Sequence, residues 1–251
     1  MSTTLKYLIL AFAFIILCRD TSLAQRAVLL SPDSVSPRLY GFLAMPSTPG
    51  PHPGVIILHG SAGWRPAYAE YAKAVADSGV AALAIDYYAE TGRDTVLAQT
   101  QRFIPVWQAT VRRAAQWLVD QPPLRGAHIG LIGFSRGAFL AVSVASSMPT
   151  VKAVVDFFGG ATPSIAPVEE QVRNFPPLLI LHGEADTLVP IEFAHRLREA
   201  VLKSGGEVEM HLYLGVHHSF TGTFSPTYSK EAAADSFKRT VEFLKRRLIQ
   251  R

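Results

Sequence analysis

The sequence predicts a single α/β domain built on a mostly parallel, twisted sheet of about eight strands, with helices on both faces. Two observations lead to this fold class. Apolar runs of strand length alternate with helical stretches along most of the 251-residue chain. Several runs, including residues 54–58 and 178–181, are almost entirely apolar, which is typical of strands covered on both faces. The composition, 49% hydrophobic and 18% charged, is that of a compact globular protein.

The first 24 residues predict a secretory signal peptide rather than part of the fold. Lys6 precedes an apolar run over residues 7–18, and small residues lead to an expected cleavage after Ala24. The run is too short to span a bilayer comfortably, and a retained anchor is the alternative. Cys18 is the only cysteine, so the mature chain has no disulfide to form in an oxidising compartment. We expect a domain over 25–251, periplasmic or secreted, without a stable membrane anchor.

The expected elements follow in order along the chain. Residues 27–30 and 40–45 predict two early strands that form an antiparallel edge, with a Ser- and Pro-rich turn between them. The other expected strands are five apolar runs that end in loops, at residues 54–58, 80–85, 129–132, 151–158 and 178–181, and a last strand at residues 207–214. The expected helices are amphipathic or alanine-rich stretches, at residues 66–78, 95–120, 138–145, 191–203 and 229–247.

Charge is mildly positive and dispersed. The formal net charge is +4, and lysines and arginines cluster only at residues 245–247. We interpret that cluster as the solvated end of a last helix, rather than as a nucleic-acid patch. No set of His, Cys, Asp and Glu has metal-ligand spacing, and no Gly-rich phosphate loop is present. We therefore expect no metal, no cofactor and no nucleic-acid partner, while the oligomeric state stays open.

Residues 133–137 have the G-x-S-x-G pattern of a nucleophile elbow. The apolar run before them and the alanine-rich stretch after them predict a strand that turns abruptly into a helix. Such a turn exposes the Ser135 hydroxyl and leaves the backbone N–H of Arg136 at a helix N-terminus, where negative charge is favoured. A serine that only caps the helix is the alternative. The small residues after the strand at 54–58 make the N–H of Ser61 a candidate second oxyanion donor.

A serine hydroxyl is a weak nucleophile that needs a base and an orienting carboxylate. Asp186 and His218 each follow a predicted strand and come after Ser135 in the chain order Ser, Asp, His. Asp156 is a rival acid inside a predicted strand, and Asp186 could instead cap a helix. His217 is the rival base. The two other histidines at strand ends, His59 and His182, are interpreted as braces for the site's loops.

Aromatic residues near strand ends are candidates for lining a substrate pocket, because ligands of open parallel sheets bind there. The candidates are Trp64, Tyr87, Tyr88 and Phe134. Packing beneath the loops is the alternative for these side chains.

Four stretches, residues 80–88, 129–137, 182–190 and 213–220, resemble the dienelactone hydrolase family of α/β-hydrolases, and the resemblance covers about residues 40–244. It implies the α/β-hydrolase fold, with His218 as base, Asp186 as acid and the N–H groups of Ser61 and Arg136 as oxyanion donors. Two residues depart from the pattern. Ser135 stands where the dienelactone enzymes have a cysteine, and Gly60 where they have a glutamate, so their substrate does not carry over.

The sequence therefore predicts an exported serine hydrolase that cleaves small or medium carboxylic esters through an acyl-enzyme. The connection from residue 158 to residue 178 is too short for a large lid, so we expect an open site. A peptide or amide hydrolase with the same triad is one alternative, and a non-catalytic binding protein of this fold is another.

Overall fold

The computed structural model describes residues 25–30, 38–92, 100–124 and 127–249. The signal peptide expected over residues 1–24 therefore lies outside the described residues, as does the beginning of the helix expected over 95–120. Within the described ranges, no helix is both long and apolar enough to cross a membrane.

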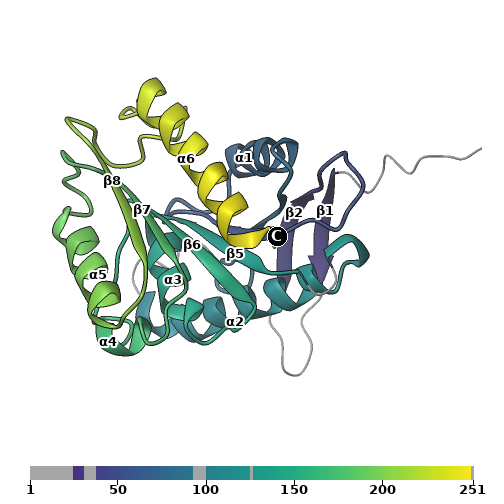
Figure 1. The fold of residues 1–251 in the computed structure, drawn as a ribbon, viewed down its shortest axis with the longest axis horizontal. Helices are drawn as coiled ribbons and strands as arrows, with labels where there is room; N and C mark the ends of the chain where they lie inside the picture. Colours follow the sequence, from purple (N-terminus) through teal and green to yellow (C-terminus); the bar gives the residue numbers. More distant parts are fainter. Residues whose placement is uncertain (1–24, 31–37, 93–99, 125–126, 250–251) are drawn as a thin grey trace, which may run out of the picture.

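One sheet of eight strands organises these residues. The strands are β1 (Gln25–Leu30), β2 (Leu39–Ala44), β3 (Gly54–Leu58), β4 (Ala81–Asp86), β5 (Ile129–Phe134), β6 (Val151–Phe157), β7 (Leu178–Gly183) and β8 (Val208–Tyr213). Their order in the sheet is β1-β2-β4-β3-β5-β6-β7-β8. β2 pairs antiparallel with β1 and with β4, and the remaining neighbours pair in parallel. The predicted mostly parallel sheet with an antiparallel edge is confirmed (Figure 1).

Helices cover both faces of the sheet, as predicted (Figure 1). One face packs against α1 (Pro66–Asp77) and α6 (Lys230–Leu248). The other packs against α2 (Thr100–Val119), α3 (Arg136–Ala145) and α5 (Glu192–Lys203). A short helix, α4 (Val168–Gln171), was not predicted, because four residues are too few to show a helical period.

The central strands consist of unbroken apolar runs because both of their faces are buried. In β3, Ile56 and Leu58 belong to the core on the α2 and α3 side. Val55 and Ile57 alternate with them and belong to the core on the α1 and α6 side. All four are at most 1% exposed.

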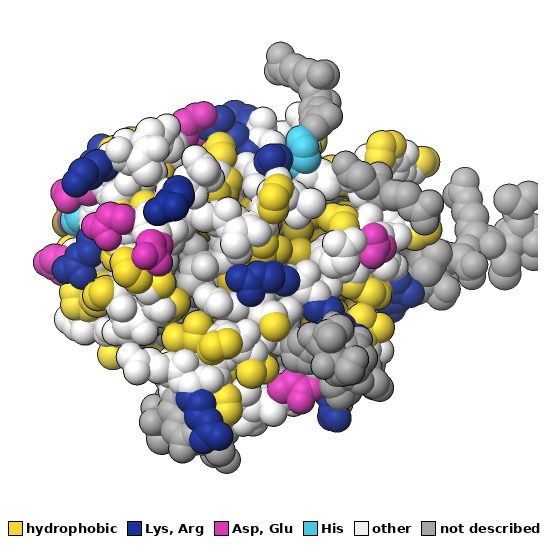
Figure 2. Space-filling view, turned by 90° about the horizontal axis from the view of Figure 1, so that it is seen from below, with side chains coloured by type: hydrophobic (Ala, Val, Ile, Leu, Met, Phe, Trp, Pro, Cys, Tyr) yellow, Lys and Arg dark blue, Asp and Glu magenta, His cyan; other side chains and the backbone are white. Residues whose placement is uncertain are grey.

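Parallel pairing places the carboxyl ends of β3, β5, β7 and β8 along one edge of the sheet. The loops that carry Ser61, Ser135, Asp186 and His218 follow these strands directly. On the molecular face shown in Figure 2, basic side chains are spread among acidic ones rather than gathered in one patch.

Candidate active site

Ser135 sits at the sharp turn between β5 and α3, with φ 53° and ψ −118°. Non-glycine residues seldom adopt a positive φ, so the surroundings must hold this conformation. The N–H of Ser135 donates to the carbonyl of Phe157 in β6 at 2.9 Å, and its carbonyl accepts from the N–H of Ala138 at 2.8 Å. Ser135 is thus held from both sides of the turn.

The two glycines of the elbow allow the backbone segments to approach closely. A Cβ on Gly133 would lie 2.4 Å from the Cα of Ala138, and one on Gly137 would lie 2.4 Å from the carbonyl oxygen of Leu58 in β3. Both distances are far below any tolerable contact. The G-x-S-x-G spacing therefore follows from the crowding of β5, α3 and β3 around Ser135.

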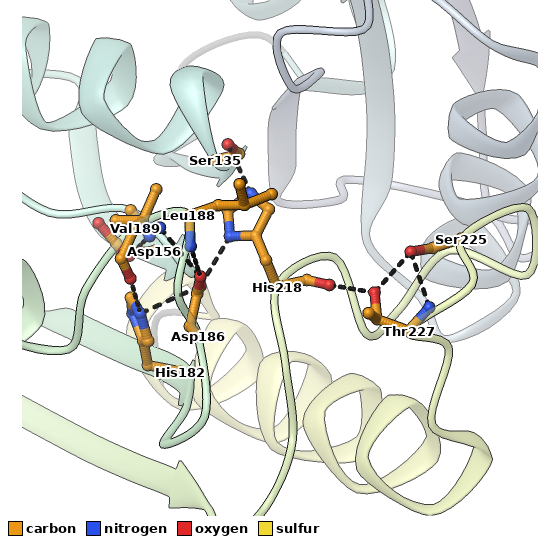
Figure 3. Close-up of polar contacts among 10 residues, drawn as sticks. Ser135, Asp156, His182, Asp186, Leu188, Val189, His218, Ser225 and Thr227 are labelled. Carbon is orange, nitrogen blue, oxygen red and sulfur yellow. Dashed lines mark hydrogen bonds and ion pairs between the residues drawn. The ribbon is translucent and has the colours of Figure 1, made fainter.

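The structure brings Ser135, His218 and Asp186 into one hydrogen-bonded series (Figure 3). Nε2 of His218 is 2.9 Å from the Oγ of Ser135, and Nδ1 of His218 is 2.6 Å from Oδ2 of Asp186. An ionised carboxylate can only accept, so Nδ1 carries the proton and Nε2 is left to accept from the serine hydroxyl. This is the tautomer that a general base requires.

Asp186 is oriented by its own loop. Its Oδ1 accepts from the N–H groups of Leu188 and Val189, both at 2.9 Å, while Nε2 of His182 lies 3.3 Å from Oδ2. Burial alone would raise the pKa of Asp186, but hydrogen bonds from His182, His218 and Val189 outweigh burial and hold that pKa well below its usual range. Asp186 is therefore anionic at neutral pH.

His218 is fixed on its other side by aromatic packing and by its own backbone. Its ring meets the ring of Phe158 edge-on, with centroids 4.9 Å apart. The hydroxyl of Thr227 donates to the carbonyl of His218, and Ser225 and Thr227 are hydrogen-bonded to each other (Figure 3). The neighbouring His217 is exposed, whereas His218 is buried and faces Ser135.

The candidate oxyanion donors flank the serine. Arg136 is the first residue of α3, where a backbone N–H has no acceptor within the helix. Ser61 lies in a turn in which the N–H of Gly63 donates to the carbonyl of Gly60. The N–H of Gly60 in turn donates to the Tyr68 hydroxyl at 2.9 Å. A Cβ on Gly60 would lie 3.6 Å from the Cβ of Ser135, so this turn lies against Ser135.

A cavity of about 610 Å³ opens beside Ser135 and His218. Its described wall is mainly apolar and comes from four helices as well as from the loops: Ala67, Tyr68 and Tyr71 from α1, Ile104 and Trp107 from α2, Phe139 and Leu140 from α3, and Phe193 from α5, with Leu188 and Phe224 from loops. Phe134 lines the cavity, as do Ser61 and Arg136. Among the described residues of that wall, Arg136 is the only one of the four types Lys, Arg, Asp and Glu. No group of three metal-ligating side chains occurs in the described ranges.

Three predicted pocket residues do not belong to the described wall of this cavity. Tyr87 is fully buried, stacks on His59 with centroids 4.0 Å apart and donates its hydroxyl to the carbonyl of His59 at 2.9 Å. The Tyr88 hydroxyl accepts from Nη1 of Arg136 at 3.0 Å. Trp64 packs toward Tyr68. The two tyrosines are thus buried around His59 rather than in the cavity wall.

Residues 39–248 match the model of the dienelactone hydrolase family. The chain belongs to this family. A carboxymethylenebutenolidase of Pseudomonas putida is 26% identical over 232 residues, which cover 86% of this chain and 94% of that protein. Being a dienelactone hydrolase family member, the protein is a hydrolase.

Solved structures agree on the fold. A dienelactone hydrolase-like promiscuous phosphotriesterase from metagenomic libraries has a TM-score of 0.78 at 22% identity, covering 90% of this chain and 100% of that chain. A dienelactone hydrolase from Anabaena variabilis has a TM-score of 0.71 at 22% identity, covering 90% of this chain and 98% of that chain. The predicted α/β-hydrolase fold is therefore confirmed.

Proposed function

We propose that this member of the dienelactone hydrolase family is an exported serine hydrolase that cleaves small or medium carboxylic esters. The observation that carries the proposal is the hydrogen-bonded series from Ser135 through His218 to Asp186. A serine in such a series, on a strained elbow beside an apolar cavity, has the base, the orienting acid and the substrate space that acyl transfer needs.

In the proposed mechanism, the Oγ of Ser135 attacks the ester carbonyl carbon while its proton passes to Nε2 of His218. The N–H groups of Ser61 and Arg136 hold the resulting oxyanion, each such donor contributing on the order of 3–4 kcal/mol to the barrier reduction. The intermediate collapses and the alcohol leaves with the proton from His218. A water molecule, activated by the same imidazole, then hydrolyses the acyl-enzyme, and the freed Ser135 recovers its proton.

The cavity supports esters of limited size. A volume of about 610 Å³ suits a short or medium acyl group together with an alcohol. The apolar side chains of its wall favour uncharged hydrocarbon portions of the substrate. Since Gly60 leaves no carboxylate beside Ser135, the proposed chemistry depends on His218 alone as the base.

The decisive experiment is hydrolysis of p-nitrophenyl esters, from acetate to laurate, by protein comprising residues 25–251. The Ser135→Ala variant is the matched control. We expect activity on acetate and butyrate that disappears in the variant, together with covalent labelling of Ser135 by a fluorophosphonate. Labelling without ester turnover, but with turnover of aryl amides, would favour an amide hydrolase. A folded protein that is neither labelled nor active would favour a binding protein.

We also propose that export follows cleavage after Ala24, on the pattern of residues 1–24. The N-terminus of the full-length chain, expressed in a bacterium and recovered from the periplasm or the medium, is expected to begin at Gln25 by mass spectrometry. Recovery of the uncleaved chain in the membrane fraction would instead support a retained anchor.

A further inference from the structure

His59 and Asp86 are in contact beside the turn that carries Ser61, and the proposed mechanism does not use them. His59 directly follows β3, and Asp86 is the last residue of β4, which pairs in parallel with β3. The register places Leu58 opposite Ile85, so the next residue of each strand end, His59 and Asp86, also lie side by side. Nε2 of His59 is 3.1 Å from Oδ1 of Asp86. The His59 side chain is 0% exposed.

The other ring nitrogen of His59 holds the backbone of the turn. Nδ1 is 2.8 Å from the carbonyl oxygen of Gly60. A carbonyl oxygen can only accept, so Nδ1 carries a proton and donates it, whether or not Nε2 is also protonated. The same carbonyl accepts from the N–H of Gly63 at 3.1 Å. Two donors therefore fix the carbonyl of Gly60.

The carbonyl of Gly60 and the N–H of Ser61 belong to one trans peptide group. In such a group the two bonds point in opposite directions, so the hydrogen bond from His59 also sets the direction of the Ser61 N–H. That N–H has no hydrogen-bond acceptor among the described residues, and Ser61 lines the cavity beside Ser135. Because Gly60 lacks a Cβ and rotates easily, anchoring its carbonyl limits rotation of the whole peptide group.

The end of β4 fixes the ring of His59. Tyr87 stacks on the ring with centroids 4.0 Å apart, and Tyr88 meets it edge-on at 4.6 Å. Oδ1 of Asp86 accepts from the N–H of Tyr88 at 3.0 Å, which holds the carboxylate near Nε2. The ring therefore cannot turn Nδ1 away from Gly60 without losing its contact with Asp86.

We propose that His59 is a positioning residue for the oxyanion hole. Held by Asp86, it anchors the peptide group between Gly60 and Ser61 so that the Ser61 N–H faces the position of the oxyanion. This inference rests on the proposed function, in which that N–H stabilises the oxyanion. His59 is absent from the described wall of the cavity and does not touch the substrate space. Loss of its hydrogen bond to Gly60 should therefore lower kcat and leave KM nearly unchanged.

The first test compares two substitutions that each keep one of the two contacts of the ring. In His59→Asn, the side-chain amide nitrogen takes the place of Nδ1 and can still donate to the carbonyl of Gly60. In His59→Gln, the amide nitrogen takes the place of Nε2 and faces Asp86 instead. Both substitutions remove the ring that stacks on Tyr87, so each is a control for the lost packing of the other.

With p-nitrophenyl butyrate, we expect kcat of His59→Gln to fall about tenfold or more, with KM within about twofold of the wild type. We expect His59→Asn to keep kcat within about threefold, because its amide replaces the anchoring donor. An equal or greater loss of kcat in His59→Asn, or a loss confined to KM, would overturn the proposal.

The second test is NMR of wild-type protein labelled with ¹⁵N-histidine, which depends neither on activity nor on a variant. We expect Nδ1 of His59 to have the chemical shift of a protonated nitrogen. An Nδ1 without a proton would overturn the proposal, even if neither His59 variant folds.

A third measurement separates failure of this inference from failure of the proposed function. Ser135 is labelled with a fluorophosphonate, whose phosphoryl oxygen takes the place of the oxyanion, and the amide proton of Ser61 is followed by NMR. We expect a downfield shift in the wild type and in His59→Asn that is larger than in His59→Gln. An equal shift in all three proteins, or none in the wild type, would overturn the inference. If the wild type is neither labelled nor active on esters, the proposed function fails, whereas the Nδ1 result still decides whether His59 holds the carbonyl of Gly60.

Discussion

Oδ2 of Asp186 lies 2.6 Å from Nδ1 of His218, although the two residues come from loops that follow different strands. Because β7 and β8 pair in parallel, their carboxyl ends lie side by side and the two loops meet. A Cβ on Gly183, at the end of β7, would lie 2.2 Å from the carbonyl oxygen of Val216. Asp186 and His218 are therefore held together by close contact between the backbones of their loops as well as by their own hydrogen bond.

The adjacent histidines are expected to differ sharply in their effect on activity. His218→Ala removes the only side chain within hydrogen-bond distance of the Ser135 Oγ in the described structure, so kcat for p-nitrophenyl butyrate should fall by on the order of 10³-fold or more. His217→Ala is the matched control and should remain within about twofold of the wild type, because His217 is exposed. An equal loss in both variants would contradict the assignment of the base.

Asp186 should make a pH-dependent contribution to the free energy of unfolding. Its pKa in the folded protein lies below its usual value, so the unfolded chain binds more protons as the pH falls. The stabilisation is therefore fully present above the ordinary Asp pKa of about 3.9 and is lost as the pH falls toward the folded-state value. Urea unfolding of wild type and Asp186→Asn should show a clear difference in unfolding free energy at pH 5. At pH 3 the difference should be smaller by on the order of 1 kcal/mol. A constant difference down to pH 3 would show that Asp186 is not stabilised as an anion.

Two glycine substitutions are expected to separate steric crowding from backbone strain. Gly133→Ala places a Cβ 2.4 Å from backbone atoms of α3 and should lower the free energy of unfolding by about 3 kcal/mol or more. Gly205→Ala is the control, since Gly205 has φ 81° but nothing within 4 Å of the added Cβ. It should cost only about 1 kcal/mol. Denaturant unfolding of both variants tests this order, and similar losses would refute the crowding argument.

The preference for acyl-chain length should depend on one side chain of α2, Ile104. Ile104 lines the cavity, and Ile104→Ala makes room for about two more methylene groups. At about 0.8 kcal/mol per methylene, kcat/KM for octanoate relative to butyrate should rise about tenfold. Leu118→Ala is a matched control on the same helix, because Leu118 is buried but absent from the described cavity wall. It should lower stability and leave the ratio unchanged, and a similar rise in both variants would contradict the assigned wall.

The sequence was sufficient to predict features that depend on local patterns. The alternating strands and helices predicted the sheet, and the positions of Ser135, Asp186 and His218 directly after strands predicted side chains at one edge of it. The structure brings these three together. It also separates His218 from His217 by burial, which residue types alone do not determine.

The cavity wall could not be predicted in the same way. Proximity to a strand end suggested that Tyr87 and Tyr88 line the substrate pocket. The direction of a side chain in a loop depends on packing, however, and both rings turn toward His59. Conversely, Ile104, Phe139 and Phe193 lie on helices far apart in the sequence, and each also fits the pattern of an ordinary core residue. Only the docking of α2, α3 and α5 on one face of the sheet brings them to the same cavity.

The neighbours of Ser135 impose its backbone conformation. A positive φ at a serine costs about 1–3 kcal/mol, and here it is maintained by β6 through Phe157 and by the close approach of α3 and β3 at the two glycines. We expect that release of any one of these segments would let the serine relax to an ordinary conformation and would withdraw its hydroxyl from His218. If Ser135 is the nucleophile, as proposed, activity would then require the completely assembled centre of the sheet, and local opening there would abolish it before the chain as a whole unfolds.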